Sequence, residues 1–210
     1  VVSLLGRNGV GRSTTVKAIM GEVPPQGTIR FKGQDIAGLP SHKIARLGLG
    51  YVPEHRDIFP SLTVRQNLIL GIKDPRRPGK WRLQEMLDMF PNLARRADTP
   101  AGVLSGGEKQ RLAVARMLLK DPKIMFFDEA TSALDSHTET ELMRNVNTLL
   151  QTMHRTSVFI AHRLRTVEDS DHIIVLDHGH VIERGTHESL LSHHGLYHEL
   201  WLAQMERISQ

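Results

Sequence analysis

Residues 6–14 read GRNGVGRST, and this stretch decides the fold. It fits the phosphate-loop pattern G-x-x-x-x-G-K-[ST], except that Arg12 stands where the pattern has lysine. An apolar, strand-like run over residues 1–5 leads directly into it. Glycines allow backbone N–H groups to turn inward around phosphate oxygens, and the positive end of the following helix points to the same place. The stretch therefore predicts a phosphate site between a strand and a helix.

The side chains of this loop predict how the phosphates are bound. Ser13 is placed to ligate Mg²⁺ through its hydroxyl, and Arg12 brings a cation toward the β- and γ-phosphates. Arginine replaces the compact ammonium of lysine with a planar fork on a longer stem, so it cannot sit against the phosphates in the same way. A plain glycine turn would look similar, so other motifs must decide. The candidate contacts are Gly6, Asn8, Gly9, Val10, Gly11, Arg12, Ser13 and Thr14.

Length and composition indicate one globular domain. The chain has 210 residues, of which 40% are hydrophobic and 24% charged, values that are ordinary for such a domain. It has no cysteine, which excludes disulfides and thiolate metal sites. No apolar run approaches the roughly 20 residues that cross a bilayer. The net charge of +4 comes from scattered basic residues, which favours a solvated surface over a nucleic-acid interface.

Strand-like and helical patterns alternate along the chain, as expected for a parallel sheet flanked by helices. Strands are predicted at 1–5, 49–53, 124–128 and 157–161, and helices near 13–21, 107–120 and 137–151. Residues 173–176 and 180–184 predict a hairpin, and a last helix begins near Leu196. The fold class is therefore α/β.

The domain organisation follows from where the strand signals stop. Between residues 60 and 103 they vanish, and we expect an inserted helical subdomain there. Residues 1–59 and 104–210 form the core of what we predict to be one domain over 1–210. Because a buried-strand pattern begins at Val1, we also expect that N-terminal strands of the sheet are missing from this sequence.

Two acidic residues end one of the predicted strands. Residues 124–129 read IMFFDE; in a nucleotide site the first carboxylate, Asp128, holds Mg²⁺ and the second, Glu129, polarises the attacking water. Upstream, residues 104–108 read LSGGE at the start of a helical pattern. A serine and two glycines at a helix N-terminus make a second anion cradle. Its candidate contacts are Ser105, Gly106, Gly107 and Glu108.

These motifs, in this order, resemble the nucleotide-binding domain of an ATP-binding cassette (ABC) transporter. The resemblance covers nearly the whole chain. Besides the segments above, residues 132–135 (SALD) resemble the family's D-loop and residues 160–163 (IAHR) its switch-histidine segment. The resemblance implies a P-loop NTPase fold with two such domains facing each other head to tail and Mg-ATP held between them.

The resemblance also implies roles for individual residues. Glu129 would be the general base, His162 would contact the γ-phosphate, and Asp135 would couple the two sites. ATP and Mg²⁺ are the expected cofactors. The expected metal ligands are Ser13, Glu54 and Asp128.

Expected partners follow from the same family. They are a second nucleotide-binding domain, identical or different, and transmembrane permease domains or subunits, with no nucleic acid. Such a domain would lie peripherally at a membrane through its permease partners. It would face the cytoplasm, or the mitochondrial matrix if the second half of the chain indicates the origin.

Two halves of the chain resemble different subgroups of the family. Residues 1–108, with Arg12 and with Glu54 in place of the usual Q-loop glutamine, resemble the ATPases of branched-chain amino acid importers. Residues 111–210 resemble mitochondrial half-transporter exporters linked to iron-sulfur and glutathione chemistry. We hypothesise a chimera, and a divergent single lineage is the alternative.

Three functions remain open at this point. The first is an ATP hydrolase that drives transport, for which two alternatives stay open: Arg12 and Glu54 reduce turnover, or the site is adapted to them. The second is a nucleotide-binding regulatory module with little or no turnover, which the same two residues favour. The third is a DNA-repair or ribosome-associated ABC ATPase, which would need coiled-coil arms or a second cassette; this sequence has neither.

Overall fold

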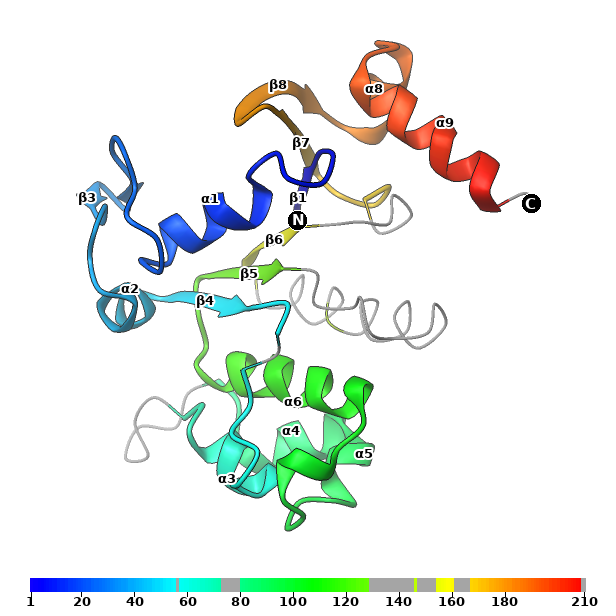
Figure 1. Cartoon of the computed structure of the whole chain (residues 1–210). Coiled ribbons are helices and arrows are strands. Elements are labelled where there is room, and N and C mark those ends of the chain that lie inside the picture. The colour runs from blue at the N-terminus through cyan, green and yellow to red at the C-terminus, as the bar shows by residue number, and fades with distance from the viewer. Residues whose placement is uncertain (56, 73–79, 129–145, 147–153, 161–166, 209–210) are drawn as a thin grey trace. The chain divides into compact units, whose positions relative to one another are not determined.

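The computed structural model describes residues 1–55, 57–72, 80–128, 146, 154–160 and 167–208 (Figure 1). The chain divides into two compact units, the first comprising Val1–Leu47 with Leu150–Gln210 and the second Gly48–Leu149. The helix predicted at 137–151 lies outside the described residues, apart from the buried Val146.

The first unit contains a mostly parallel sheet. β1 lies between β6 and β7 and pairs in parallel with both, with Val2 opposite Val158 on one side and His172 on the other. β8 pairs antiparallel with β7. The elements are β1 (Val2–Leu5), α1 (Arg12–Ile19), β2 (Arg30–Phe31), β3 (Gln34–Asp35), α2 (Ser41–Leu47), β6 (Thr156–Ile160), β7 (His172–Asp177), β8 (His180–Gly185), α8 (His187–Ser192) and α9 (Leu196–Ile208).

The second unit contains two paired parallel strands and several helices (Figure 1). α6 is buried on several faces along most of its length, and its apolar residues Leu112, Ala115 and Leu118 are fully buried. The elements are β4 (Leu49–Val52), α3 (Val64–Ile69), α4 (Leu83–Met89), α5 (Pro91–Ala94), a 3-10 turn η1 (Ala101–Val103), α6 (Gly106–Leu119) and β5 (Ile124–Asp128).

The α/β fold predicted from the sequence is confirmed by these elements. Each predicted strand and the C-terminal hairpin are present, as are the helices after the phosphate loop and after the LSGGE segment. The described residues between 60 and 103 form α3, α4, α5 and η1, with only an isolated bridge between Thr63 and Pro100. The boundaries of the inserted subdomain stay a prediction. No helix among the described residues is long and apolar enough to cross a membrane.

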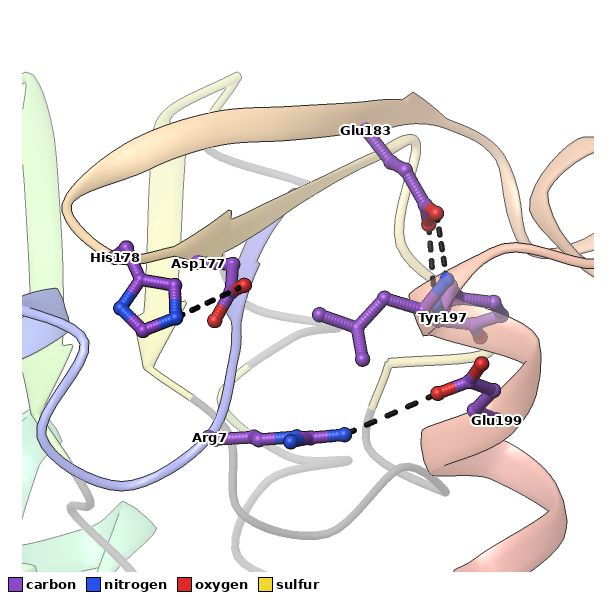
Figure 2. Close-up of polar contacts among 7 residues, drawn as sticks. Arg7, Asp177, His178, Glu183, Tyr197 and Glu199 are labelled. Carbon is purple, nitrogen blue, oxygen red and sulfur yellow. Dashed lines mark hydrogen bonds and ion pairs between the residues drawn. The ribbon is translucent and has the colours of Figure 1, made fainter.

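A carboxylate holds the start of the C-terminal helix α9. The two Glu183 carboxylate oxygens accept hydrogen bonds from the backbone N–H groups of Leu196 at 2.7 Å and Tyr197 at 3.0 Å (Figure 2). These N–H groups have no partner within the helix, and a negative charge there is favoured by the helix dipole. An added Cβ at Gly195 would push the Glu183 carboxylate away from these N–H groups. Glu183 therefore joins α9 to β8.

Tyr197 anchors α9 in the core of the first unit. Its side chain is fully buried together with Ile173 and Val175 of β7. Its hydroxyl lies 2.6 Å from Nδ1 of His187. Burial, with a smaller contribution from Glu168, raises the pKa of Tyr197 to about 12. The phenol therefore stays neutral to a higher pH than that of an exposed tyrosine.

The loop between β4 and α3 is fixed by two side chains of the second unit. Asn67, fully buried on α3, accepts from Phe59 N–H at 2.9 Å and donates to the carbonyls of Phe59, Leu62 and Thr63 at 2.9, 3.3 and 3.0 Å. Arg116 on α6 donates to the carbonyl of Asp57. Its guanidinium also lies 5.4 Å from the centre of the Phe59 ring. Both helices therefore hold the segment that follows Glu54.

Replacing Asn67 by alanine is expected to lower the free energy of unfolding by about 2–4 kcal/mol, because several buried backbone groups lose their partner together. Urea unfolding measures the loss. Asn92→Ala is the matched control, since Asn92 is exposed on α5 and accepts a hydrogen bond from the exposed Arg95. A loss below about 1 kcal/mol for Asn67→Ala would contradict the role of this side chain.

Candidate functional site

The phosphate loop connects β1 to α1 as the sequence predicts. Gly6, Gly9 and Gly11 have φ angles of 152°, 84° and 98°, a region that side-chain-bearing residues rarely adopt. α1 begins at Arg12 without a side-chain cap and without an acidic residue in its first turn. Such a helix N-terminus favours an anion. The backbone of the loop is therefore suited to phosphate.

Arg12 occupies the position of the usual lysine and is 6% exposed. Its Nη2 donates to Oδ1 of Asn8 at 3.2 Å, within the loop itself. Asn8 thus fixes one arm of the guanidinium fork, an interaction that the single ammonium of lysine would not reproduce in the same geometry. The contact indicates a loop built around arginine.

We therefore expect Arg12→Lys to leave ATP turnover unchanged or lower, because lysine keeps the charge but loses the fork bonded to Asn8. Arg12→Ala, which removes the charge, is expected to weaken ATP binding by about tenfold or more. Phosphate release and binding of a fluorescent ATP analogue measure the two effects. A Lys variant that turns over faster than the original chain would show that arginine is a handicap.

Two contacts between ionisable side chains beside the loop were not predicted from the sequence. Arg7 lies 3.9 Å from Glu199 of α9, and His178 lies 3.7 Å from Asp177 at the β7–β8 turn (Figure 2). Arg7 and Glu199 are 65% and 67% exposed, so solvent screens their attraction. No local sequence signal could have found this pair, because its partners are far apart in the chain. We assign it no part in binding.

The LSGGE segment is a capping box at the start of α6. Ser105 Oγ accepts from the Glu108 N–H at 3.3 Å, and the Glu108 carboxylate accepts from the Ser105 N–H at 2.8 Å. Glu108 also pairs with Arg96 at 3.2 Å. Burial would raise the pKa of Glu108, but these interactions and the charge of Arg111 lower it below its ordinary value. The S-x-x-E spacing could have predicted the box.

The second anion cradle predicted at the LSGGE segment stays a prediction. Gly106 and Gly107 form the first residues of α6, so the LSGGE segment does lie at a helix N-terminus. Ser105 and Glu108 have a structural role there as the capping box of α6.

Asp128 ends β5 and is 1% exposed. One of its carboxylate oxygens, Oδ2, accepts a hydrogen bond from the Tyr51 hydroxyl at 3.1 Å. Glu54 follows β4 and is exposed. Among the described residues, no group of three or more His, Asp or Glu side chains gathers as a metal site. The oxygen groups of Ser13 and Asp128 nevertheless suit Mg²⁺, which usually takes one or two protein ligands and completes its shell with water and phosphate.

The predicted site residues divide between the described and undescribed parts of the chain. The phosphate-loop residues lie together in the first unit, whereas Glu54, Asp128 and the LSGGE segment belong to the second. Glu129, Asp135 and His162 lie outside the described residues. Their roles stay predictions.

Comparison with known proteins identifies the family. A family model described as "ABC transporter" matches residues 1–132. The chain belongs to this family. The resemblance that the motifs indicated is thereby confirmed.

Relatives and solved structures agree with the ABC assignment. The chain is 43% identical to "Iron-sulfur clusters transporter ATM1, mitochondrial" of Chaetomium globosum, over 97% of this chain and 35% of the relative. It is 40% identical to the human "Iron-sulfur clusters transporter ABCB7, mitochondrial", over 99% of this chain and 28% of the relative. A bacterial Atm1-family ABC exporter solved with ATP bound matches 97% of this chain and 36% of its own, with 36% identity and a TM-score of 0.82.

These alignments define what the ABC chain shares with its relatives. It spans about a third of the length of the two transporters and of the exporter structure. The exporter likeness extends over almost the whole chain, not only residues 111–210. The importer likeness of residues 1–108 and the chimera hypothesis stay predictions.

Proposed function

We propose that this ABC domain binds and hydrolyses Mg-ATP and thereby drives transport through membrane domains of the Atm1 exporter type. The observation that carries the proposal is the phosphate loop, whose glycine φ angles and uncapped helix start suit a polyphosphate. The likeness to an Atm1-family exporter with ATP bound supports it. The relatives are iron-sulfur clusters transporters, so we propose a cargo of that chemistry and a membrane of mitochondrial type, with the domain on the matrix face.

In the proposed mechanism, each motif supplies one part of the reaction. The loop amides and Arg12 hold the phosphates, and Ser13 and Asp128 would hold Mg²⁺, which would neutralise charge on the phosphates. Glu129 accepts a proton from the attacking water. Ser105 of a second domain completes the coordination of the γ-phosphate, so efficient hydrolysis requires two domains head to tail. A lone domain binds ATP but hydrolyses it slowly.

The second candidate is a nucleotide-binding regulatory module without efficient turnover. Glu54 favours it, because a carboxylate replaces the neutral amide expected there and adds negative charge next to the triphosphate. Phosphate release at saturating Mg-ATP, measured over a range of protein concentrations, tests both candidates. A rate that rises more steeply than protein concentration supports hydrolysis by a pair of domains. ATP binding with no release above the buffer rate supports the regulatory module.

A further inference from the structure

Tyr51 contacts the carboxylate of Asp128, which we propose as a ligand of Mg²⁺. Its hydroxyl donates to Oδ2 of Asp128 at 3.1 Å. A carboxylate as buried as Asp128 is costly unless it is hydrogen-bonded. A phenol is a neutral donor, so it orients the carboxylate without cancelling the charge that attracts a cation. An arginine or lysine in the same place would compete with the metal.

The strands on which these residues lie fix their relative position. β4 and β5 pair in parallel with Tyr51 opposite Phe126, so the phenol reaches two residues forward along β5 to Asp128. Gly50 keeps β4 close to its neighbours, because an added Cβ would lie 2.9 Å from the Pro122 side chain and 3.1 Å from that of Met117. The hydrogen bond therefore spans two paired strands, of which β4 packs closely against α6 and the loop before β5.

The same strand leads to the other acidic residue near the predicted metal. β4 ends at Val52, and Glu54 follows two residues later. Tyr51 consequently joins the strand that presents Glu54 to the strand that ends in Asp128. A change in the direction of either strand end would alter this hydrogen bond.

We propose that Tyr51 is a positioning residue for the Mg²⁺ of this ABC domain and acts by orienting the Asp128 carboxylate. The inference rests on the proposed function, because it requires Asp128 to bind Mg²⁺ together with ATP. Groups that orient metal ligands typically contribute about 10–100-fold to metal affinity or activity. The effect should appear in the Mg²⁺ requirement and not in the affinity for metal-free ATP.

The test is a Mg²⁺ titration of nucleotide binding in the Tyr51→Phe variant, read from the fluorescence of an ATP analogue. The Mg²⁺ concentration at half-maximal binding is expected to rise about tenfold, whereas binding without Mg²⁺ is unchanged. Tyr197→Phe is the matched control, because the chain has two tyrosines and this change removes the other hydroxyl. A midpoint for Tyr51→Phe within about twofold of the original chain overturns the inference.

A double-mutant cycle separates positioning from a general structural role. In an Asp128→Asn background, Tyr51→Phe is expected to change the Mg²⁺ requirement less than about twofold, because the carboxylate through which it acts is already gone. A full tenfold effect in that background overturns the inference. If the original chain binds no ATP, both the proposed function and this inference fail. If binding depends on Mg²⁺ but the Mg²⁺ requirement is the same in Tyr51→Phe, only the inference is refuted.

A measurement on the unaltered chain covers the case in which Tyr51→Phe does not fold. Two tyrosines give two signals in a ¹³C-tyrosine NMR spectrum, and Tyr197→Phe assigns them. Addition of Mg²⁺ to the ATP-bound chain is expected to shift the Tyr51 signal, because its hydrogen-bond acceptor gains a cation. An unchanged Tyr51 signal under saturating Mg²⁺ contradicts the proposal.

Discussion

Replacing Glu129 by glutamine is expected to lower ATP turnover by about 10²–10⁴-fold, the contribution of a general base. Glutamine has nearly the same size but cannot accept a proton from water at neutral pH. ATP binding should change by less than about threefold, because the phosphates are held by the loop and not by this side chain. Phosphate release at saturating Mg-ATP gives the rate, and an ATP analogue gives the affinity.

The matched control for this change is Glu206→Gln, which removes one carboxylate from the exposed face of α9. Its turnover should equal that of the original chain. Equal turnover in Glu129→Gln and Glu206→Gln would mean that the measured hydrolysis does not use Glu129. The regulatory module would then be the better description of this domain.

Replacing Gly6 by alanine is expected to destabilise the domain by about 2–5 kcal/mol and to weaken ATP binding by at least about tenfold. An added Cβ would meet the backbone carbonyl of Leu176 and lie 2.7 Å from Cγ2 of Val10. Neither a backbone carbonyl in β7 nor the loop can move without disturbing the phosphate cradle. Urea unfolding and binding of an ATP analogue measure the two losses.

Gly38→Ala separates this contact from backbone strain alone. Gly38 has a φ angle of 69°, but an added Cβ has nothing within 4 Å. Its cost should therefore be strain only, about 1–2 kcal/mol, with ATP binding unchanged. If both variants unfold at the same urea concentration, the contact of the added Cβ at position 6 with β7 does not contribute to the loss of stability.

The parts of the fold next to the motifs could be predicted from the sequence. Apolar runs before the phosphate loop and before Asp128 have the length and composition of buried strands, and β1 and β5 form there. The β2–β3 hairpin was not predicted from the sequence. In the structure Lys32 and Gly33 form its two-residue turn, with φ angles of 51° and 80°. Its strands are only two residues long, too short for an alternating pattern.

The residues of the candidate site could be predicted from the sequence, but the contacts between them could not. Arg12 and Asp128 are recognised from motif spacing, whereas Tyr51 meets Asp128 across 77 positions of sequence. A tyrosine in a strand is ordinary, and only the β4–β5 register brings its hydroxyl to the carboxylate. From the sequence, Asn67 would likewise be assigned to the exposed face of a helix. In the structure it is buried beneath the loop between β4 and α3. Non-local pairing of this kind leaves no local pattern.

The attachment of α9 through Glu183 has a consequence for exchanging segments between relatives. A graft that replaced only residues after Gly195 would bring in a helix whose first amides depend on a carboxylate supplied by the recipient. β7, β8 and α9 therefore form one transferable segment, because β7 pairs with β8 and Glu183 of β8 holds the start of α9. Engineered hybrids that cut between β8 and α9 should unravel at the helix start unless the recipient has an acidic residue at position 183.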